Sequence, residues 1–305
     1  MKVLVTGGAG FIGSHLVELL LQRNCEVVVL DNLHTGVREH VPDSVSLLTA
    51  DVRDKEIIDI FEKEQFDAVV HLAGQTTVGD SVANPAFDAS VNIQGSVNIL
   101  ECCRKTGVKR IVFAATAAAY GDCDVLPLTE DLVTEPLSFY GLSKLTVEKY
   151  LALYHKLYGL SYAALRFANV YGERQGDGGE GGVISIFTKK FASNEPIKIF
   201  GDGGQTRDFI YVGDIVSGIY QALINLTANG VYNLSTNTEV SVNEMTALLN
   251  RISGKGIVPN YEKVRDGDIY RSVLSNEKAM AELNWQPVVT LSDGVARTYR
   301  YFASK

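Results

Sequence analysis

Residues 1–13 read MKVLVTGGAGFIG, a short apolar strand that runs directly into a glycine-rich turn. Gly7 permits a sharp turn, Gly10 lets the backbone approach a pyrophosphate, and Gly13 allows the next helix to pack closely on the sheet. That helix offers free N–H groups and the positive end of its dipole to an anion. The spacing is GxxGxxG and no Gly-Lys-Ser/Thr follows, which excludes a Walker-type loop. The stretch therefore predicts the first turn of a dinucleotide-binding sheet.

Short apolar runs alternate with amphipathic stretches through the first half of the chain. The runs are 3–5, 26–30, 45–48, 68–70, 110–113 and 162–167, and the helix-like stretches between them are 11–23, 53–64, 84–106 and 138–158. The runs are rich in Val and Ile and lack polar alternation, as expected for strands covered on both faces. Strand, helix and strand in series predict an α/β fold with a doubly wound parallel sheet of the Rossmann kind.

The pattern changes beyond about residue 170. A glycine-rich loop follows at 175–182, then a helix-like stretch at 213–226, a strand-like run at 230–234, a Pro-Asn turn at 259–260 and short helices near the end. We therefore expect a dinucleotide-binding domain and a smaller C-terminal substrate-binding lobe. The first comprises residues 1–170 plus about 207–235, and the second about 171–206 plus 236–305.

The overall composition narrows the class of protein. The chain has 305 residues, with 28 basic and 36 acidic side chains and a formal net charge of −8, which argues against a nucleic-acid or anionic-membrane partner. The four cysteines form no CxxC pair and the five histidines no HExxH spacing. We therefore expect no metal site, no disulfide framework and a cytoplasmic location. The N-terminus has no signal-peptide layout and no apolar run reaches about 18 residues, so no membrane span is expected.

The identity of the dinucleotide follows from the end of the second strand. Asp31 stands there, where an acidic side chain bonds the two ribose hydroxyls of NAD and repels the 2′-phosphate of NADP. No Arg follows immediately to accommodate that phosphate, so NAD is the expected cofactor, and a turn that binds nothing is the alternative. Further contacts are expected where the third and fourth strands end, at Asp51-Val52 and at Leu72-Ala73-Gly74.

Tyr140 and Lys144 form a Tyr-x-x-x-Lys pair on one face of a predicted helix. Such a pair is common by chance, and Tyr301 and Lys305 make a second one. The first pair follows the fifth strand, beside the expected cofactor. A phenol with a pKa of about 10 is a poor base for an alcohol, and lowering that pKa to about 7 takes about 4 kcal/mol. One cation about 4 Å away supplies roughly that energy at an effective dielectric of about 20.

Thr116 ends the fifth strand and offers a hydroxyl that can orient a substrate. The alternative reading is a surface threonine in a turn. Ala117-Ala118-Ala119 follow it and supply no acid or base.

Together these motifs resemble the extended short-chain dehydrogenases, nearly from end to end. The resemblance is carried by 7–13, Asp31-Asn32, 72–74, Asn92, the strand that ends at Thr116 before Tyr120-Gly121, and Tyr140-x-x-x-Lys144. Three more stretches resemble the nucleotide-sugar members: RFANVYG at 166–172, RDFI at 207–210 and RDGD at 265–268. Within the family, the chain is most similar to the enzymes that invert C4 of a UDP-hexose.

The resemblance implies a mechanism and a set of contacts. Tyr140 takes the proton of the sugar 4-hydroxyl, hydride passes to bound NAD, the 4-keto sugar rotates, and hydride returns to its other face. The implied NAD contacts are Gly7, Gly10, Phe11, Ile12, Gly13, Asp31, Asn32, Thr35, Gly36, Asp51, Val52, Leu72, Ala73, Gly74, Gln75, Asn92, Tyr140 and Lys144. The implied substrate contacts are Thr116, Asn169, Val183, Arg207, Arg265, Asp268 and Ser272. Guanidinium groups suit a diphosphate, although a surface ion pair is the alternative for each Arg.

The resemblance also separates branches of the family. Its dehydratases and decarboxylases carry acidic residues just after the Thr, so the alanines at 117–119 favour epimerisation of UDP-glucose and UDP-galactose. Ser272 is small where the family can limit room near C2 of the sugar, so N-acetyl sugars are expected to be accepted too. A homodimer through 84–106 and 138–158 is expected, and the loop at 176–182 is either a lid or a plain connection. A UDP-glucuronate epimerase, a nucleotide-sugar reductase and a non-catalytic dinucleotide sensor are the alternatives.

Overall fold

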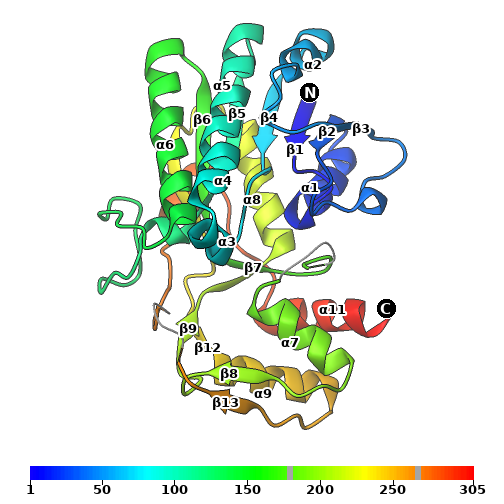
Figure 1. Ribbon diagram of the computed structural model, residues 1–305, viewed down its shortest axis with the longest axis vertical. Coiled ribbons are helices and arrows are strands. Elements are labelled where there is room, and N and C mark those ends of the chain that lie inside the picture. Colours follow the sequence, from blue (N-terminus) through cyan, green and yellow to red (C-terminus); the bar gives the residue numbers. More distant parts are fainter. Residues whose placement is uncertain (177–180, 265–268) are drawn as a thin grey trace.

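The computed structural model describes residues 1–176, 181–264 and 269–305 (Figure 1). Seven strands of this described chain form one parallel sheet in the order β11-β6-β5-β4-β1-β2-β3. They are β1 (Lys2–Thr6), β2 (Glu26–Asp31), β3 (Ser46–Thr49), β4 (Ala68–His71), β5 (Arg110–Thr116), β6 (Ser161–Phe167) and β11 (Gly230–Leu234). The predicted doubly wound parallel sheet is therefore confirmed, and β11 joins it from late in the sequence.

Helices cover both faces of the sheet, which explains the apolar runs without polar alternation. The covering helices are α1 (Phe11–Gln22) and α8 (Val212–Ile224) on one face, and α2 (Ile57–Glu64), α5 (Gly95–Thr106) and α6 (Phe139–Tyr158) on the other. Successive residues of β1 enter different cores: Val3 and Val5 pack with α1 and α8, whereas Leu4 packs with α2, α5 and α6. Residues of the inner strands are thus buried on one side of the sheet or the other.

The predicted helix at 84–106 consists of three consecutive pieces. They are α4 (Pro85–Ala89), a π-helical turn (Ser90–Gln94) and α5. The Asn84 side chain accepts a hydrogen bond from Phe87 N at 3.1 Å and Pro85 occupies the first turn, which explains the start of α4. π-turns occur often at functional sites, and this one buries the side chain of Asn92.

Two local predictions were wrong. The predicted helix at 53–64 begins only at Ile57, because carboxylates hold the preceding residues in turns: Asp51 Oδ1 accepts from Arg53 N at 3.0 Å, and Asp54 Oδ2 accepts from Asp51 N at 2.9 Å. The predicted Pro-Asn turn at 259–260 is also wrong, since Asn260 begins a strand, β13 (Asn260–Glu262). Two helices, α3 (Val78–Ala83) and α7 (Val183–Ala192), were not predicted.

Most of the remaining elements gather below the sheet in Figure 1, whereas α10 (Glu277–Leu283) packs against β11 and α8 at the edge of the sheet. Strand pairs join β7 (Asn169–Tyr171) to β10 (Phe209–Tyr211), β8 (Lys198–Phe200) to β13, and β9 (Thr206–Arg207) to β12 (Val240–Ser241). The later helices are α9 (Val242–Ser253), α10 (Glu277–Leu283) and α11 (Leu291–Ala303). One hydrophobic cluster extends from α1 and α8 to α7, α9 and α11, so this lobe shares a core with the sheet. Every helix in the described ranges is too short or too polar to cross a bilayer.

Candidate active site

The glycine turn after β1 has the geometry that its sequence predicts. Gly7 has a φ of +71°, and a Cβ there would lie 2.7 Å from Ala73 N. A Cβ on Gly13 would lie 2.1 Å from Gly7 O, so only glycine lets α1 pack this closely. Gly10 differs, because a Cβ there would meet only Gly7 O, at 3.2 Å. The space beside Gly10 is therefore open, and Phe11 and Ile12 begin α1 directly after it. An open space at the start of a helix fits a bound pyrophosphate.

Asp31 at the end of β2 is held against this turn. Its Oδ2 accepts from Ala9 N at 2.9 Å, and its Oδ1 accepts from Leu33 N at 2.9 Å. A Cβ on Gly36 would lie 2.7 Å from Asp31 Oδ1, so the glycine leaves room beside the carboxylate. Oxygens fixed by backbone N–H groups keep further lone pairs for ribose hydroxyls, so the site fits NAD. The neighbouring Asn32 and Thr35 are exposed.

The predicted contacts after β3 are already engaged within the protein. Arg53 donates from Nε to Asp51 Oδ1 at 2.7 Å, and Asn32 Nδ2 donates to Asp51 Oδ2 at 2.9 Å. The guanidinium of Arg53 holds the pKa of the Asp51 carboxyl well below its usual range. Val52 is buried, and its Cγ2 would lie 2.6 Å from a Cβ on Gly95. The Asp51 side chain is still partly accessible to a ligand. The side chain of Val52 instead packs against α5.

The end of β4 is joined to the π-turn by Asn92. Asn92 Oδ1 accepts from Gln75 N at 2.9 Å, and Asn92 Nδ2 donates to Gln75 O at 3.1 Å. Asn92 Nδ2 also donates to Ser143 Oγ on α6 at 3.1 Å. One amide side chain therefore ties together the strand end that follows Leu72 and Ala73, the π-turn and the helix that carries Tyr140 and Lys144.

A buried chain of hydrogen bonds supports Asn92 from below. The Ser96 hydroxyl donates to Asn92 O at 2.5 Å, so His71 Nε2 has to donate to Ser96 Oγ at 3.0 Å. His71 Nδ1 then accepts from the Thr6 hydroxyl at 2.6 Å, and that hydroxyl accepts from Ala73 N at 3.2 Å. Burial lowers the pKa of His71 to about 3, so the ring is neutral at working pH. This chain was not predicted from the sequence, and it connects the glycine turn to the π-turn.

Lys144 and Asn92 meet over Gly74. A Cβ on Gly74 would lie 2.7 Å from Asn92 Oδ1 and 3.1 Å from Lys144 Nζ. Lys144 is 3% exposed, and its Nζ lies 4.8 Å from the centre of the Phe113 ring. Burial lowers the pKa of Lys144 to about 8. Because Gly74 has no side chain, the amine of Lys144 has room to lie at the carboxyl end of the sheet.

This contact predicts the effect of a single methyl group. Gly74→Ala is expected to lower kcat about a hundredfold, because the methyl displaces a buried amine that has little room to move. The melting temperature should change far less than the activity. Gly79→Ala is the matched control, since a Cβ on Gly79 meets nothing within 4 Å. Steady-state kinetics and a thermal melt of both variants test this prediction, and equal activities of the two would contradict it.

Tyr140 is brought beside Thr116 by the start of α6. Ser138 caps this helix by accepting from Gly141 N at 3.1 Å, and a Cβ on Gly141 would lie 2.6 Å from Ala118 O. Gly141 thus lets the helix approach the residues that follow β5. Burial raises the pKa of Tyr140 above its ordinary value, and a hydrogen bond with the Thr116 side chain partly opposes the rise. Burial therefore works against Tyr140 as a base, and a nearby positive charge has to oppose this effect.

Asp208 organises the second half of the site. Its carboxylate accepts from Thr236 N at 2.9 Å, from Thr236 Oγ1 at 2.7 Å and from Asn237 N at 3.0 Å. Leu274 N donates to it at 3.4 Å, and Asn169 N donates to the Asp208 carbonyl at 2.9 Å. Sequence reasoning assigned no role to Asp208, although it stands next to Arg207. It holds together three segments that carry predicted substrate contacts.

Three of the predicted substrate residues, Asn169, Arg207 and Ser272, belong to segments that Asp208 joins. Arg207 is on β9, where its Nη1 donates to Thr206 O at 2.8 Å, and Ser272 immediately precedes the buried Val273. Val183 begins α7 and is exposed. Two predicted contacts, Arg265 and Asp268, lie outside the described residues. The loop at 176–182 also lies largely outside them.

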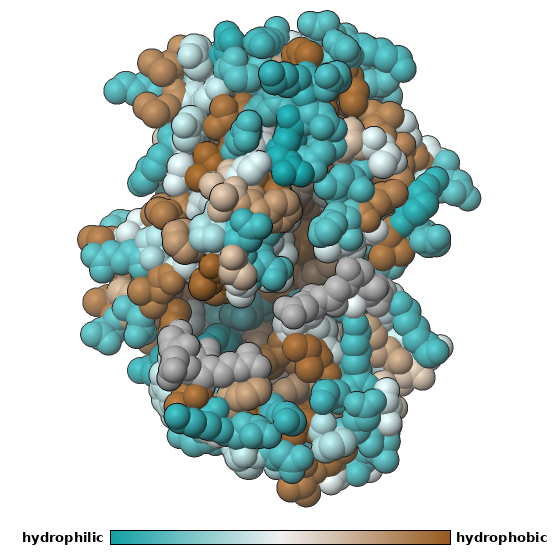
Figure 2. Space-filling view, in the orientation of Figure 1, coloured by the Kyte–Doolittle hydropathy of each residue, from teal (hydrophilic) through white to brown (hydrophobic). Residues whose placement is uncertain are grey.

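A cavity of about 290 Å³ opens in the lobe two residues before Arg207. It is lined by Phe200, Gly201, Asp202, Gln205, Val264, Ile269 and Tyr270. Figure 2 shows this face of the molecule hollowed between the sheet above and the lobe below. The lining combines aromatic rings with amide and carboxylate groups, which suits a planar polar ring.

A comparison with known protein families shows to which family the chain belongs. The model described as "NAD dependent epimerase/dehydratase family" matches residues 3–235. The chain belongs to this family. The predicted family, its NAD cofactor and the prediction of an enzyme are therefore confirmed.

Solved structures of epimerases are similar to this chain over nearly its whole length. A UDP-glucose 4-epimerase from Thermotoga maritima, solved with UDP-glucose, is 41% identical with a TM-score of 0.97, and the match covers 100% of this chain and 99% of that one. A UDP-glucose 4-epimerase from Thermus thermophilus, in complex with NAD, is 41% identical with a TM-score of 0.92 and covers 99% of both chains. A UDP-N-acetylglucosamine 4-epimerase from Methanobrevibacter ruminantium is 31% identical, with a TM-score of 0.95 and coverage of 99% and 98%.

Proposed function

We propose that this enzyme interconverts UDP-glucose and UDP-galactose, a reaction of galactose metabolism, by inverting C4 through a transient 4-keto sugar. The observation that carries the proposal is the convergence of Tyr140, Thr116 and Lys144 at the end of the sheet, beside the glycine turn that fits NAD. The neighbouring Ala117–Ala119 turn offers no acid or base for dehydration or decarboxylation. Redox chemistry at one carbon is what these groups support best.

The protein groups divide the work of this reaction. When bound, NAD accepts hydride from C4 and returns it. Tyr140 removes the proton of the 4-hydroxyl in the forward step and gives it back in the reverse step. The Thr116 hydroxyl, which accepts from Ala118 N at 3.1 Å, holds the sugar oxygen in line with the phenol. Lys144, when protonated, stabilises the phenolate, because a positive charge nearby favours the ionised form.

The nucleotide part of the substrate is proposed to bind where the lobe meets the NAD-binding part. Arg207 supplies a guanidinium for the diphosphate, and the cavity lined by Phe200 and Tyr270 receives the base. Arg265 and Asp268 are proposed as further contacts on the strength of the sequence. The chain accordingly divides into an NAD-binding part, residues 1–170 plus about 207–235, and a sugar-nucleotide lobe that comprises the rest.

Product analysis tests the proposed reaction. The purified enzyme is incubated with UDP-glucose, UDP-galactose and their N-acetyl forms, without added cofactor, and the products are identified by NMR. We expect each sugar to convert to its C4 epimer. A dehydrated or decarboxylated sugar among the products would overturn the proposal in favour of another member of the family. So would stoichiometric consumption of NADH in a separate incubation with added NADH, or turnover in a parallel incubation with UDP-glucuronate but with none of these four sugars.

The breadth of substrate is proposed to depend on Ser272. Ser272→Tyr is expected to lower turnover of UDP-N-acetylglucosamine at least about tenfold more than turnover of UDP-glucose, because an added ring occupies the space that an N-acetyl group needs. Ser272→Ala, which adds no bulk, should leave the ratio unchanged. Rates with the two sugars test the prediction, and an equal loss on both sugars after Ser272→Tyr would disprove it.

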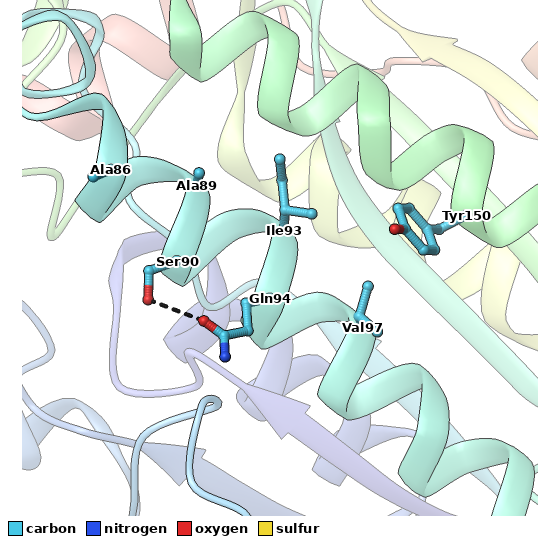
Figure 3. Close-up of a pocket in the computed structure, with 7 residues that line it drawn as sticks. All are labelled: Ala86, Ala89, Ser90, Ile93, Gln94, Val97 and Tyr150. Carbon is cyan, nitrogen blue, oxygen red and sulfur yellow. Dashed lines mark hydrogen bonds between the residues drawn. The ribbon is translucent and has the colours of Figure 1, made fainter.

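We propose that two copies of the chain pair through α4, the π-turn, α5 and α6. An apolar stripe on α6 supports this arrangement: Leu142, Leu153 and Leu157 are 49%, 52% and 63% exposed. Beside them a shallow hollow of about 460 Å³ lies between α6 and the helical run of 84–106 (Figure 3). It is lined by Ala86, Ala89, Ser90, Ile93, Gln94, Val97 and Tyr150. Contiguous apolar surface of this kind favours association.

A charge placed in this stripe should separate the copies. Leu153→Glu is expected to convert the dimer to monomer, because the new carboxylate would be buried without a partner. Leu226→Glu, which changes an equally exposed leucine elsewhere, should remain a dimer. Light scattering coupled to gel filtration gives the mass of both variants, and a dimeric Leu153→Glu protein would rule out this interface.

The cytoplasmic location stays a proposal, supported by four free cysteines.

A further inference from the structure

The carboxylate of Asp88 is buried in α4 without full compensation. Asp88 is 1% exposed, and its Oδ1 accepts from Asn92 Nδ2 at 3.0 Å. Its Oδ2 finds no hydrogen-bond partner in the described chain. A buried ionised carboxylate is costly unless a nearby charge favours it, and native proteins rarely keep an unsatisfied one without a reason.

The side-chain amide of Asn92 links this carboxylate to the place where the lysine amine lies. Its nitrogen binds Asp88, and its oxygen faces Gly74, over which Lys144 Nζ also lies. The negative charge of Asp88 raises the pKa of Lys144, against the lowering that burial causes, and it also raises the pKa of Tyr140. Among the described residues, the other titratable group that faces Lys144 from a neighbouring strand is His71, which is neutral.

We propose that Asp88 is a positioning residue for catalysis, a counterion that acts across Asn92 to keep the Lys144 amine charged in a pocket that would otherwise favour its neutral form. This role rests on the proposed function, because only a base such as Tyr140 needs that charge. It explains why an acidic residue occupies a buried helical position beside the sheet. It also explains why the π-turn brings Asn92 to the same place, since the amide fixes the distance between carboxylate and amine.

The Asp88→Asn variant separates this role from packing. Asparagine has the same shape and can still accept from Asn92, so the fold should persist. Removing the negative charge lowers the pKa of Lys144 and of Tyr140 together. Both limbs of the kcat pH profile should therefore move to lower pH, by about one unit, with a loss of about tenfold at alkaline pH and a gain at acid pH. Asp59→Asn, at an exposed position on α2, is the control with an unshifted profile.

A second measurement needs no sugar turnover. The ultraviolet absorbance of tyrosinate is titrated in the purified enzyme, and the Tyr140 contribution is taken as the difference from the matching Tyr140→Phe protein. Asp88→Asn should move this titration to lower pH, whereas Asp88→Glu, which keeps the charge, should restore the wild-type position. A uniform loss of activity at all pH values, an unshifted titration, or an Asp88→Glu protein that behaves like Asp88→Asn would overturn the inference. Wild-type enzyme without epimerase activity would instead count against the proposed function.

Discussion

Replacing Tyr140 with Phe is expected to reduce kcat about a thousandfold while the protein keeps its fold and its NAD. The loss follows from the removal of the one group placed to exchange a proton with the sugar 4-hydroxyl. The Thr116 side chain, which interacts with Tyr140, stays in place, and the phenyl ring fills the same space. Substrate binding should change little, so the effect should appear in kcat more than in KM.

The matched control for this variant is Tyr158→Phe. Tyr158 lies at the end of the same helix, where it is 55% exposed. This control should retain full activity and the same cofactor content, measured by absorbance after denaturation. A Tyr140→Phe enzyme with unimpaired turnover would remove Tyr140 from the reaction.

Replacing Lys144 with Met is expected to reduce kcat at least about a hundredfold at neutral pH. Burial already raises the pKa of Tyr140. The proposed role of Lys144 is to oppose this rise with its positive charge, which methionine lacks. The acid limb of the kcat profile should therefore move to higher pH, opposite in direction to the shift expected for Asp88→Asn. Methionine keeps most of the length of the side chain and its apolar stem, but not the charge.

The control for Lys144→Met is Lys156→Met, an exposed lysine on the same helix. It removes the same charge from the protein without touching the buried cluster. Its pH profile should match that of the parent enzyme. If the acid limb of Lys144→Met coincides with the wild-type limb, the lysine does not tune Tyr140.

The parts of the fold that could be predicted are set by local sequence patterns and by steric limits on single residues. Strands such as β1 and β4 are continuous apolar runs, and the structure places them within one residue of the prediction. The glycine turn follows from steric limits at Gly7 and Gly13 that hold in any protein. The Tyr140–Lys144 pair follows from helical spacing, and its place beside Thr116 follows from the rule that ligands bind at the carboxyl ends of parallel strands.

The unpredicted parts depend on contacts between distant segments. Nothing local marks the π-turn at 90–94, because its irregular register is set by packing against Gly74 and Ser143. Asp88 and Asp208 look like surface carboxylates in the sequence, and only the assembled fold buries them. Asn260 follows a proline that suggests a turn, yet pairing with β8 makes it a strand. Tertiary contacts overrode local preference in each case.

The most direct measurement follows the hydrogen atom at C4. UDP-glucose that carries deuterium at C4 is incubated with the enzyme in ordinary water, and the UDP-galactose that forms is examined by NMR and mass spectrometry. Because the same hydrogen leaves C4 as hydride and returns to the opposite face within one closed site, we predict that the deuterium is retained at C4 of the product. Loss of the label to solvent, or a product with unchanged configuration at C4, would contradict a mechanism in which Tyr140 and Lys144 serve reversible oxidation at that carbon.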